Sequence, residues 1–173
     1  TAQWTWAKWL PHCFDENRER RFLSSTARET DELLKRLEEI LKTRELAGRT
    51  EEVPLPYYLF VFTQLEMADK QPILKYLLKE GGNPGAGALF LYDEMHHLPK
   101  ECNIVLEVKH GQGLLMEKRD MNRKRRFRMD SFEDNDLEKF ARQMAPLRIY
   151  GSGAESALPA CVTFLEGYGV HTP

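Results

Sequence analysis

The sequence of 173 residues is long enough for one compact domain with a buried core. Apolar residues make up 42% and charged residues 30% of the chain, a balance that is ordinary for a globular protein and argues against a disordered one. The formal net charge of -2 argues against general binding to nucleic acid, and no apolar stretch approaches the ~20 residues that a membrane-spanning helix requires.

The start of the chain and its cysteines indicate a segment of a longer intracellular protein. The chain begins at Thr1, carries no secretory signal and crowds three tryptophans into its first nine residues. Its three cysteines are an odd number at wide spacing, without a C-x-x-C pair. Such spacing favours buried thiols in a reducing compartment over a disulfide framework or a zinc cluster. We therefore expect a cytosolic location.

The first third of the chain predicts a short strand, a helix and a buried strand. The strand is expected at Arg21–Ser25, and directly after it Thr26 and Glu29 have the N-cap and N3 spacing of a capping box. Leucines at helical spacing then predict a helix from Ala27 to Glu45. The continuous apolar run 57–63 lacks alternation, which predicts a central strand buried on both faces.

The rest of the chain continues the alternation of strands and helices. In chain order we expect a helix capped by Asp69, strands at 88–92 and 104–108, a hairpin turn at 110–113, a helix at 136–145 and a last strand at 147–150. Strand, helix, strand, helix, strand predicts an α/β fold, with a mostly parallel sheet flanked by helices and an added β-hairpin.

The positions that would bind a nucleotide in such a fold carry the wrong residues. A phosphate-binding loop needs G-x-x-x-x-G-K-[ST] between a strand and a helix, but residues 23–28 contain neither Gly nor Lys. An ATPase also needs acidic side chains after its central strand to hold Mg²⁺, where this chain has Thr63 and Gln64. We therefore expect no catalytic residue and no cofactor. Ser25, Thr26, Thr63 and Gln64 are the degenerate pocket positions, and Ser25 and Thr26 form either a weak anion site or a plain capping box.

Other residues that could bind a metal or act as nucleophiles give weaker indications of function. Asp93, Glu94, His96 and His97 offer metal-ligand types in a loop, but they match no zinc-protease spacing and adjacent His side chains tend to diverge. We expect a polar surface loop without a metal. The scattered histidines and the lack of a G-x-S-x-G elbow give no serine triad, and Cys102 has only its residue type in favour of a nucleophile.

A basic cluster is the strongest concentration of charge in the chain. It contacts either anionic lipid headgroups, nucleic acid or an acidic partner, or it is a solvated hairpin whose field the acidic residues at 130–138 largely cancel. Its members are Lys118, Arg119, Arg123, Lys124, Arg125, Arg126 and Arg128.

The order of several short stretches resembles one family. The stretches are Leu10-Pro11-His12, Arg21-Phe22, 56–61, 98–102, 141–148, Leu158-Pro159 and 164–170. Their series is similar to the cytoplasmic region between the membrane segments and the first full ATPase domain of the FtsK/SpoIIIE-type ATPases of type VII secretion. The likeness is to the EssC-like branch of Gram-positive firmicutes more than to the mycobacterial EccC branch, and the basic segment 118–128 departs from the family's common pattern.

The resemblance implies a degenerate P-loop-ATPase-like (RecA-like) domain at the cytoplasmic face of the cell membrane. Residues 1–173 would form a single domain, with a Trp-rich lead-in at 1–14, an α/β core at 15–163 and a linker toward a following ATPase domain at 164–173. Its function would be to couple or regulate the motor domains and the membrane complex without catalysis of its own. The alternatives are a nucleotide sensor without hydrolysis and a docking surface for secreted substrates or accessory subunits. Implied partners are adjacent ATPase domains, other secretion-complex subunits and secreted substrates, but not nucleic acid.

Overall fold

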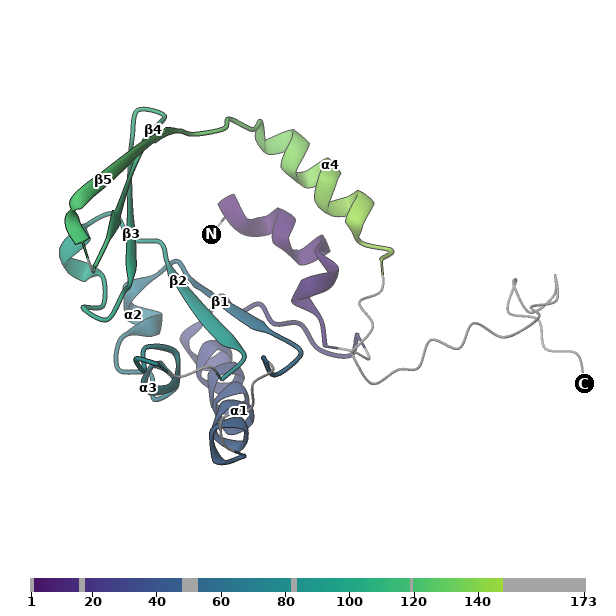
Figure 1. Cartoon of the computed structure of the whole chain (residues 1–173). Helices are drawn as coiled ribbons and strands as arrows, with labels where there is room; N and C mark the ends of the chain where they lie inside the picture. The colour runs from purple at the N-terminus through teal and green to yellow at the C-terminus, as the bar shows by residue number, and fades with distance from the viewer. Residues whose placement is uncertain (1, 16–17, 48–52, 82–83, 119, 148–173) are drawn as a thin grey trace, which may run out of the picture.

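The computed structural model describes residues 2–15, 18–47, 53–81, 84–118 and 120–147 (Figure 1). These residues form an α/β structure with a two-stranded parallel sheet and a three-stranded antiparallel sheet. The elements in chain order are the 3-10 helices η1 (Ala2–Trp9) and η2 (Pro11–Cys13), α1 (Ala27–Leu46), β1 (Tyr58–Phe62), α2 (Leu65–Ala68), α3 (Leu74–Leu77), β2 (Ala86–Phe90), η3 (Met95–His97), β3 (Ile104–Lys109), β4 (Gln112–Glu117), β5 (Asp120–Arg128) and α4 (Asp134–Met144).

Helix α1 forms as its sequence predicts. The hydroxyl of Thr26 accepts a hydrogen bond from the backbone N–H of Glu29 at 3.3 Å, and the Glu29 carboxylate accepts from the backbone N–H of Thr26 at 3.2 Å. This reciprocal pair is a capping box, which satisfies donors that the first turn leaves without helical partners. Leu34, Leu37 and Leu41 lie one to two turns apart and are buried together on one face of the helix.

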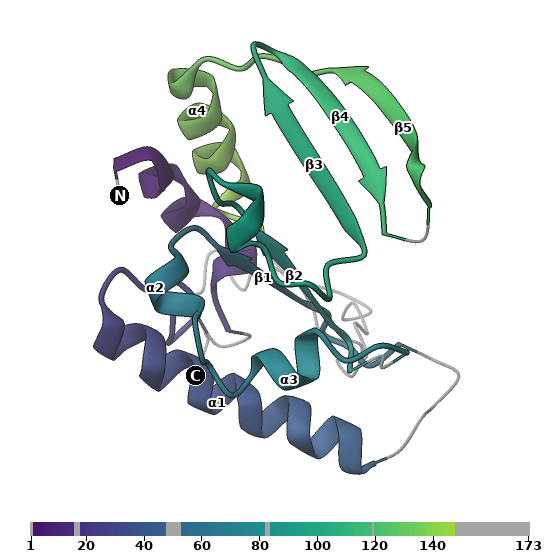
Figure 2. The same cartoon turned by 90° about the vertical axis from the view of Figure 1, so that its left-hand side faces the viewer.

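The parallel sheet consists of β1 and β2, and helices cover only one of its faces (Figures 1 and 2). Phe60 and Phe62 are buried, whereas Leu59 and Val61 are 65% and 42% exposed. The prediction of a central strand buried on both faces is therefore wrong. Strand β1 has one neighbouring strand among the described residues, and its apolar run alternates between the core and the uncovered face.

The main core lies between α1 and the covered face of this sheet. It joins the leucines of α1 to Phe60, Phe62, Ala68, Ile73 and Tyr76. The segment from α2 to α3 differs from its prediction, because two one-turn helices replace one longer helix and Asp69 ends α2 instead of capping a helix. Ile73 nevertheless inserts into the core with 1% exposure.

The antiparallel sheet has the order β3-β4-β5. Its β3–β4 turn is the predicted hairpin, made by His110 and Gly111 with φ of 50° and 74°. Positive φ at both central residues is typical of the two-residue turn that matches the twist of a hairpin. The hairpin pairing of β3 with β4 is confirmed, but the prediction that β3 also belongs to the parallel sheet is wrong, because β3 pairs with neither β1 nor β2 among the described strands. The larger sheet in the described part of the chain is therefore antiparallel, which corrects the predicted mostly parallel sheet.

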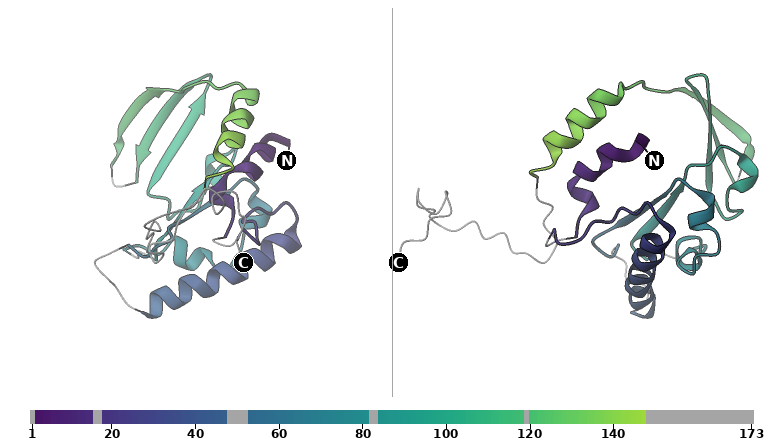
Figure 3. Two further views of the ribbon diagram at one scale, coloured as in Figure 1. Left: turned by 90° about the vertical axis from the view of Figure 1, so that its right-hand side faces the viewer. Right: turned by 180° about the vertical axis from the view of Figure 1, so that it is seen from behind.

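Helix α4 packs beside the N-terminal helix η1 (Figure 1), as the views from other sides also show (Figure 3). The guanidinium of Arg142 lies 4.1 Å from the ring centre of Trp9, a cation–π contact. Ala7 and Ala141 are buried in the same region. The predicted strand at Arg21–Ser25 is wrong, since only an isolated bridge joins Arg21 to Phe14. Residues 148–150 of the predicted last strand lie outside the described residues, as do 151–173.

The described elements fall into three packing groups. The first is β1–β2 with α1, α2 and α3, the second is β3–β4–β5, and the third is η1 and η2 with α4. Figure 2 shows the second group standing above the first, with the third beside it. Among the described helices, none has both the length and the apolar character needed to cross a membrane.

Candidate docking surface

The start of α1 is occupied by a side chain of the helix itself. The carboxylate of Glu29 accepts hydrogen bonds from the backbone N–H groups of Ser25 and Thr26, at 3.1 and 3.2 Å, and lies 3.3 Å from the Ser25 hydroxyl. The bond from Ser25 and then those from Thr26 hold the pKa of Glu29 below its usual value. A phosphate bound at this helix start would lie beside the negatively charged Glu29 carboxylate. The charge of Glu29 would repel it, and the N–H groups of Ser25 and Thr26 would be free for it only if Glu29 moved away.

The other two pocket positions follow β1. Thr63 is exposed and Gln64 is half-buried, and both precede α2. The starts of α1 and α2 approach each other where the Thr30 hydroxyl lies 3.4 Å from the sulfur of Met67. Within the described ranges, no hydrogen bond joins Ser25 or Thr26 to Thr63 or Gln64. The four predicted positions therefore do not form one bonded site.

The basic cluster lies mainly on β5, where strand alternation divides it between two faces of the antiparallel sheet. Residues paired across neighbouring antiparallel strands point to the same face. Arg126 pairs with Leu114, and Lys124 and Arg128 pair with Met116 and Gln112. Gln112 in turn pairs with Lys109 of β3. Four cations thus share one face, which we name the basic face: Lys109, Lys124, Arg126 and Arg128.

Among the described residues, one of these four cations forms an ion pair. Lys109 forms an ion pair with Glu107, and this contact, followed by the field of Lys124, lowers the pKa of Glu107. Lys124, Arg126 and Arg128 make no ion pair with any residue that the structure describes. Alternation along the strand places them about 7 Å apart. The sequence did not single out Lys109, although its place at the end of a predicted strand could have indicated it.

The remaining members of the basic cluster are dispersed. Arg125 lies on the opposite face and forms an ion pair with Glu117 at 3.9 Å. Lys118 lies in the turn after β4, Arg123 is exposed on β5, and Arg119 lies outside the described residues.

Two of the acidic residues that were expected to neutralise the cluster have other partners. Asp136 pairs with Lys139 at 3.7 Å, and Glu138 pairs with Arg142 at 2.7 Å. Both ion pairs lie within α4, the helix that packs against η1. No ion pair between α4 and β5 occurs in the described part of the chain, so contact pairing with α4 does not cancel the charge of the basic face.

The opposite face of the antiparallel sheet carries exposed apolar side chains on β3, beside the ion pair of Arg125 and Glu117. Ile104, Leu106 and Val108 of β3 are each more than half exposed. The ring of Phe127 lies over Gly113, where a Cβ atom would come within 2.1 Å of Phe127 Cζ. Exposed apolar side chains thus gather on this sheet and on the uncovered face of β1–β2. The tryptophans are partly engaged elsewhere, since Trp9 lies half-buried beneath Arg142.

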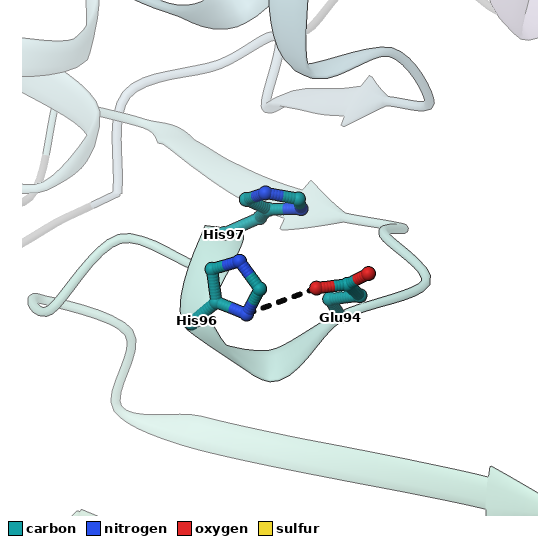
Figure 4. A group of neighbouring side chains, drawn as sticks. All are labelled: Glu94, His96 and His97. Carbon is teal, nitrogen blue, oxygen red and sulfur yellow. Dashed lines mark ion pairs between the residues drawn. The ribbon is translucent and has the colours of Figure 1, made fainter.

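The loop after β2 brings three metal-ligand side chains together (Figure 4). His96 Nδ1 lies 3.1 Å from Oε2 of Glu94, and the ring centres of His96 and His97 are 4.1 Å apart. The expectation that the two imidazoles diverge is therefore wrong. In the same loop, Cys102 is half-buried, and burial followed by the charge of Glu101 raises its thiol pKa. A raised pKa reduces the thiolate fraction, which disfavours a nucleophile.

These features define an α/β domain with a self-capped helix start and an exposed basic sheet face. No protein-family model and no solved structure matches the chain. It is similar to the type VII secretion system protein EssC of Staphylococcus aureus (strain NCTC 8325 / PS 47), with 27% identity over 172 residues that cover 95% of this chain. It is also similar to the ESX secretion system protein YukB of Bacillus subtilis (strain 168), with 25% identity over 166 residues and 94% of this chain.

The chain spans 12% of the length of EssC and 11% of the length of YukB. Both relatives are named as secretion system proteins, and each aligns with nearly all of this chain. They point to an EssC-type type VII secretion protein, as the sequence resemblance predicts.

Proposed function

We propose that this chain is a non-catalytic, ATPase-like module of a type VII secretion ATPase. In this proposal it lies at the cytoplasmic face of the membrane and couples or regulates the motor domains and the membrane complex. The observation that carries the proposal is the Glu29 carboxylate, which holds the backbone N–H groups of Ser25 and Thr26 at the helix start. The absence of Gly and Lys from residues 23–28 supports it as well.

A degenerate RecA-like fold is part of this proposal. Its support is the parallel pairing of β1 and β2 across the short helices α2 and α3, with α1 on the covered face. In this fold the start of α1 would take the place of the phosphate-binding helix start. A nucleotide sensor has less support, because its N–H donors are already engaged.

Calorimetric titration of the purified chain with ATP and Mg²⁺, together with a phosphate-release assay, tests the absence of catalysis. We expect neither heat of binding nor release. Saturable binding without release would favour the nucleotide sensor. Turnover that copurifies with the protein through successive columns would refute a non-catalytic module. The variant Glu29→Ala provides a further comparison, because it frees the N–H groups of Ser25 and Thr26 just before α1 without supplying a lysine or a magnesium ligand.

A second candidate function is docking of a partner on the basic face. Strand β5 pairs only with β4 among the described strands, so its outer edge is open to another strand. An extended acidic segment added to that edge would repeat its side chains about every 7 Å, as the cations of β5 do. Cations on an edge strand also discourage unwanted pairing. A basic face that serves for docking should bind acidic segments in preference to neutral ones. Cations that serve only to prevent unwanted strand pairing should show no such preference.

The docking function can be tested in a chimera of the Bacillus subtilis protein that carries this chain in place of its matching segment. Reversing Lys124, Arg126 and Arg128 to Glu should abolish ESX secretion by the chimera while its abundance stays unchanged. The matched control reverses three exposed cations of α1, and should leave secretion intact: Lys35, Arg36 and Lys42. Equal secretion by both charge-reversed chimeras would contradict a role for the basic face.

A further inference from the structure

We infer that Glu94, His96 and His97 form a binding site for a divalent transition metal of the zinc type. The three residues come from the loop after β2, and one ligand atom of each lies within 4.8 Å of the other two (Figure 4). No relative's name and no part of the proposed function assigns a metal to this loop. The site is independent of the secretion role, because it uses neither the start of α1 nor the basic face.

The geometry of the cluster fits a small coordination sphere. Ligand atoms 2.0–2.1 Å from a tetrahedral zinc ion are about 3.3 Å apart. His96 Nδ1 and Glu94 Oε2 are already 3.1 Å apart, so both atoms could bind one metal ion with little movement. His97 completes the set after a small rotation of its ring, and water would fill the fourth position. Two imidazoles and a carboxylate favour zinc, nickel or copper over magnesium or calcium, which take oxygen ligands.

The local fold explains why adjacent histidines converge. The 3-10 turn η3 contains both histidines, and Glu94 is its N-cap in an extended conformation. Because the chain turns tightly there, the Glu94 carboxylate folds back toward the His96 ring. All three side chains are exposed, so the protein need not open to admit an ion. The loop also directly follows the carboxyl end of a parallel strand, the edge at which open α/β sheets bind ligands.

The test uses the chain purified without a polyhistidine tag and stripped of metal by a chelator. Co²⁺ serves as the probe, because its visible absorption reports imidazole coordination, and Zn²⁺ is then added as a competitor. We expect one equivalent of Co²⁺ to bind and Zn²⁺ to displace it. His96→Ala and His97→Ala should each weaken binding at least about tenfold, since even the loss of a residue that only orients a ligand costs 10–100-fold. Zn²⁺ should also raise the melting temperature of the unmodified chain.

Two controls separate this site from other ligands in the protein. His110→Ala removes an exposed histidine of the β3–β4 turn and should bind Co²⁺ as tightly as the unmodified chain. Cys102→Ser should also bind normally. The inference is overturned if the unmodified chain shows no cobalt spectrum, if the His96 and His97 variants bind as tightly as it does, or if Cys102→Ser abolishes binding. The altered histidines are exposed, so circular dichroism should show unchanged folding in both variants.

Discussion

Replacement of Leu41 by Ala should severely destabilise the core group. Leu41 lies on α1 with 0% exposure, among the aromatic side chains of β1 and the leucines of its own helix. The change removes three carbon atoms, and at about 0.8 kcal/mol per buried CH₂ the transfer cost is about 2.4 kcal/mol. The remaining cavity adds to this, so we expect a total loss of about 3 to 5 kcal/mol. A domain is typically stable by about 5–15 kcal/mol, so this loss is a large fraction of its stability.

The measurement is urea unfolding followed by far-UV circular dichroism, with Leu46→Ala as the matched control. Leu46 is the last residue of the same helix and is 79% exposed, so the same chemical change there should cost less than about 0.5 kcal/mol. Both variants alter helix propensity in the same direction, so the difference between their losses in the free energy of unfolding reports the effect of burial. Equal unfolding midpoints for the two variants would refute the assignment of this face of α1 to the core.

Three further predictions concern the capping box and the antiparallel sheet. Thr26→Ala should lower the free energy of unfolding by about 1 kcal/mol in urea titrations, because it removes the N-cap acceptor of α1; no change would contradict the capping role. The folded-state pKa of Glu29 is lowered, so its stabilisation should be complete above its unfolded pKa of about 4.3 and disappear as the pH falls through the lower folded value. Unfolding midpoints of the unmodified chain and Glu29→Gln should converge in acid, and a constant gap would oppose this reasoning. Gly113→Ala should destabilise the chain less in a Phe127→Ala background, with a coupling of about 1 kcal/mol in a double-mutant cycle; additive effects would contradict the ring contact.

The sequence predicted those features that depend on neighbours along the chain. The Thr26–Glu29 spacing and the leucine repeat of α1 are local signals, and the structure confirms both. The hairpin at His110–Gly111 was also predicted, since a glycine there permits the positive φ that the turn requires. Pairing partners of strands are not local. The apolar residues of β1 therefore did not reveal how many faces of this strand would be covered. The predicted hairpin indicated the pairing of β3 with β4, but nothing in 104–109 showed that β3 would lie apart from β2.

The candidate surface was only partly predictable for the same reason. The basic residues were evident, but dividing them between two faces requires the register of β5 against β4, which depends on a turn and on a shift between Met116 and Glu117. Lys109 joins Lys124 on the basic face only through the pairing of three strands. The Glu94–His96 contact likewise depends on the tight turn of η3, which residue spacing alone does not reveal.

The division into three packing groups should allow parts of the chain to move relative to one another. Residue contacts are concentrated within each group, so displacing one group against another would disrupt few of them. Such a chain should open in stages, with hydrogen exchange fastest in the mostly exposed edge strands β3 and β5 and slowest in α1, whose leucines are buried in the main core. Because α4 packs against η1 and not against the main core, a force applied to either helix would be transmitted directly to the other. The three packing groups would then move as nearly rigid units relative to one another.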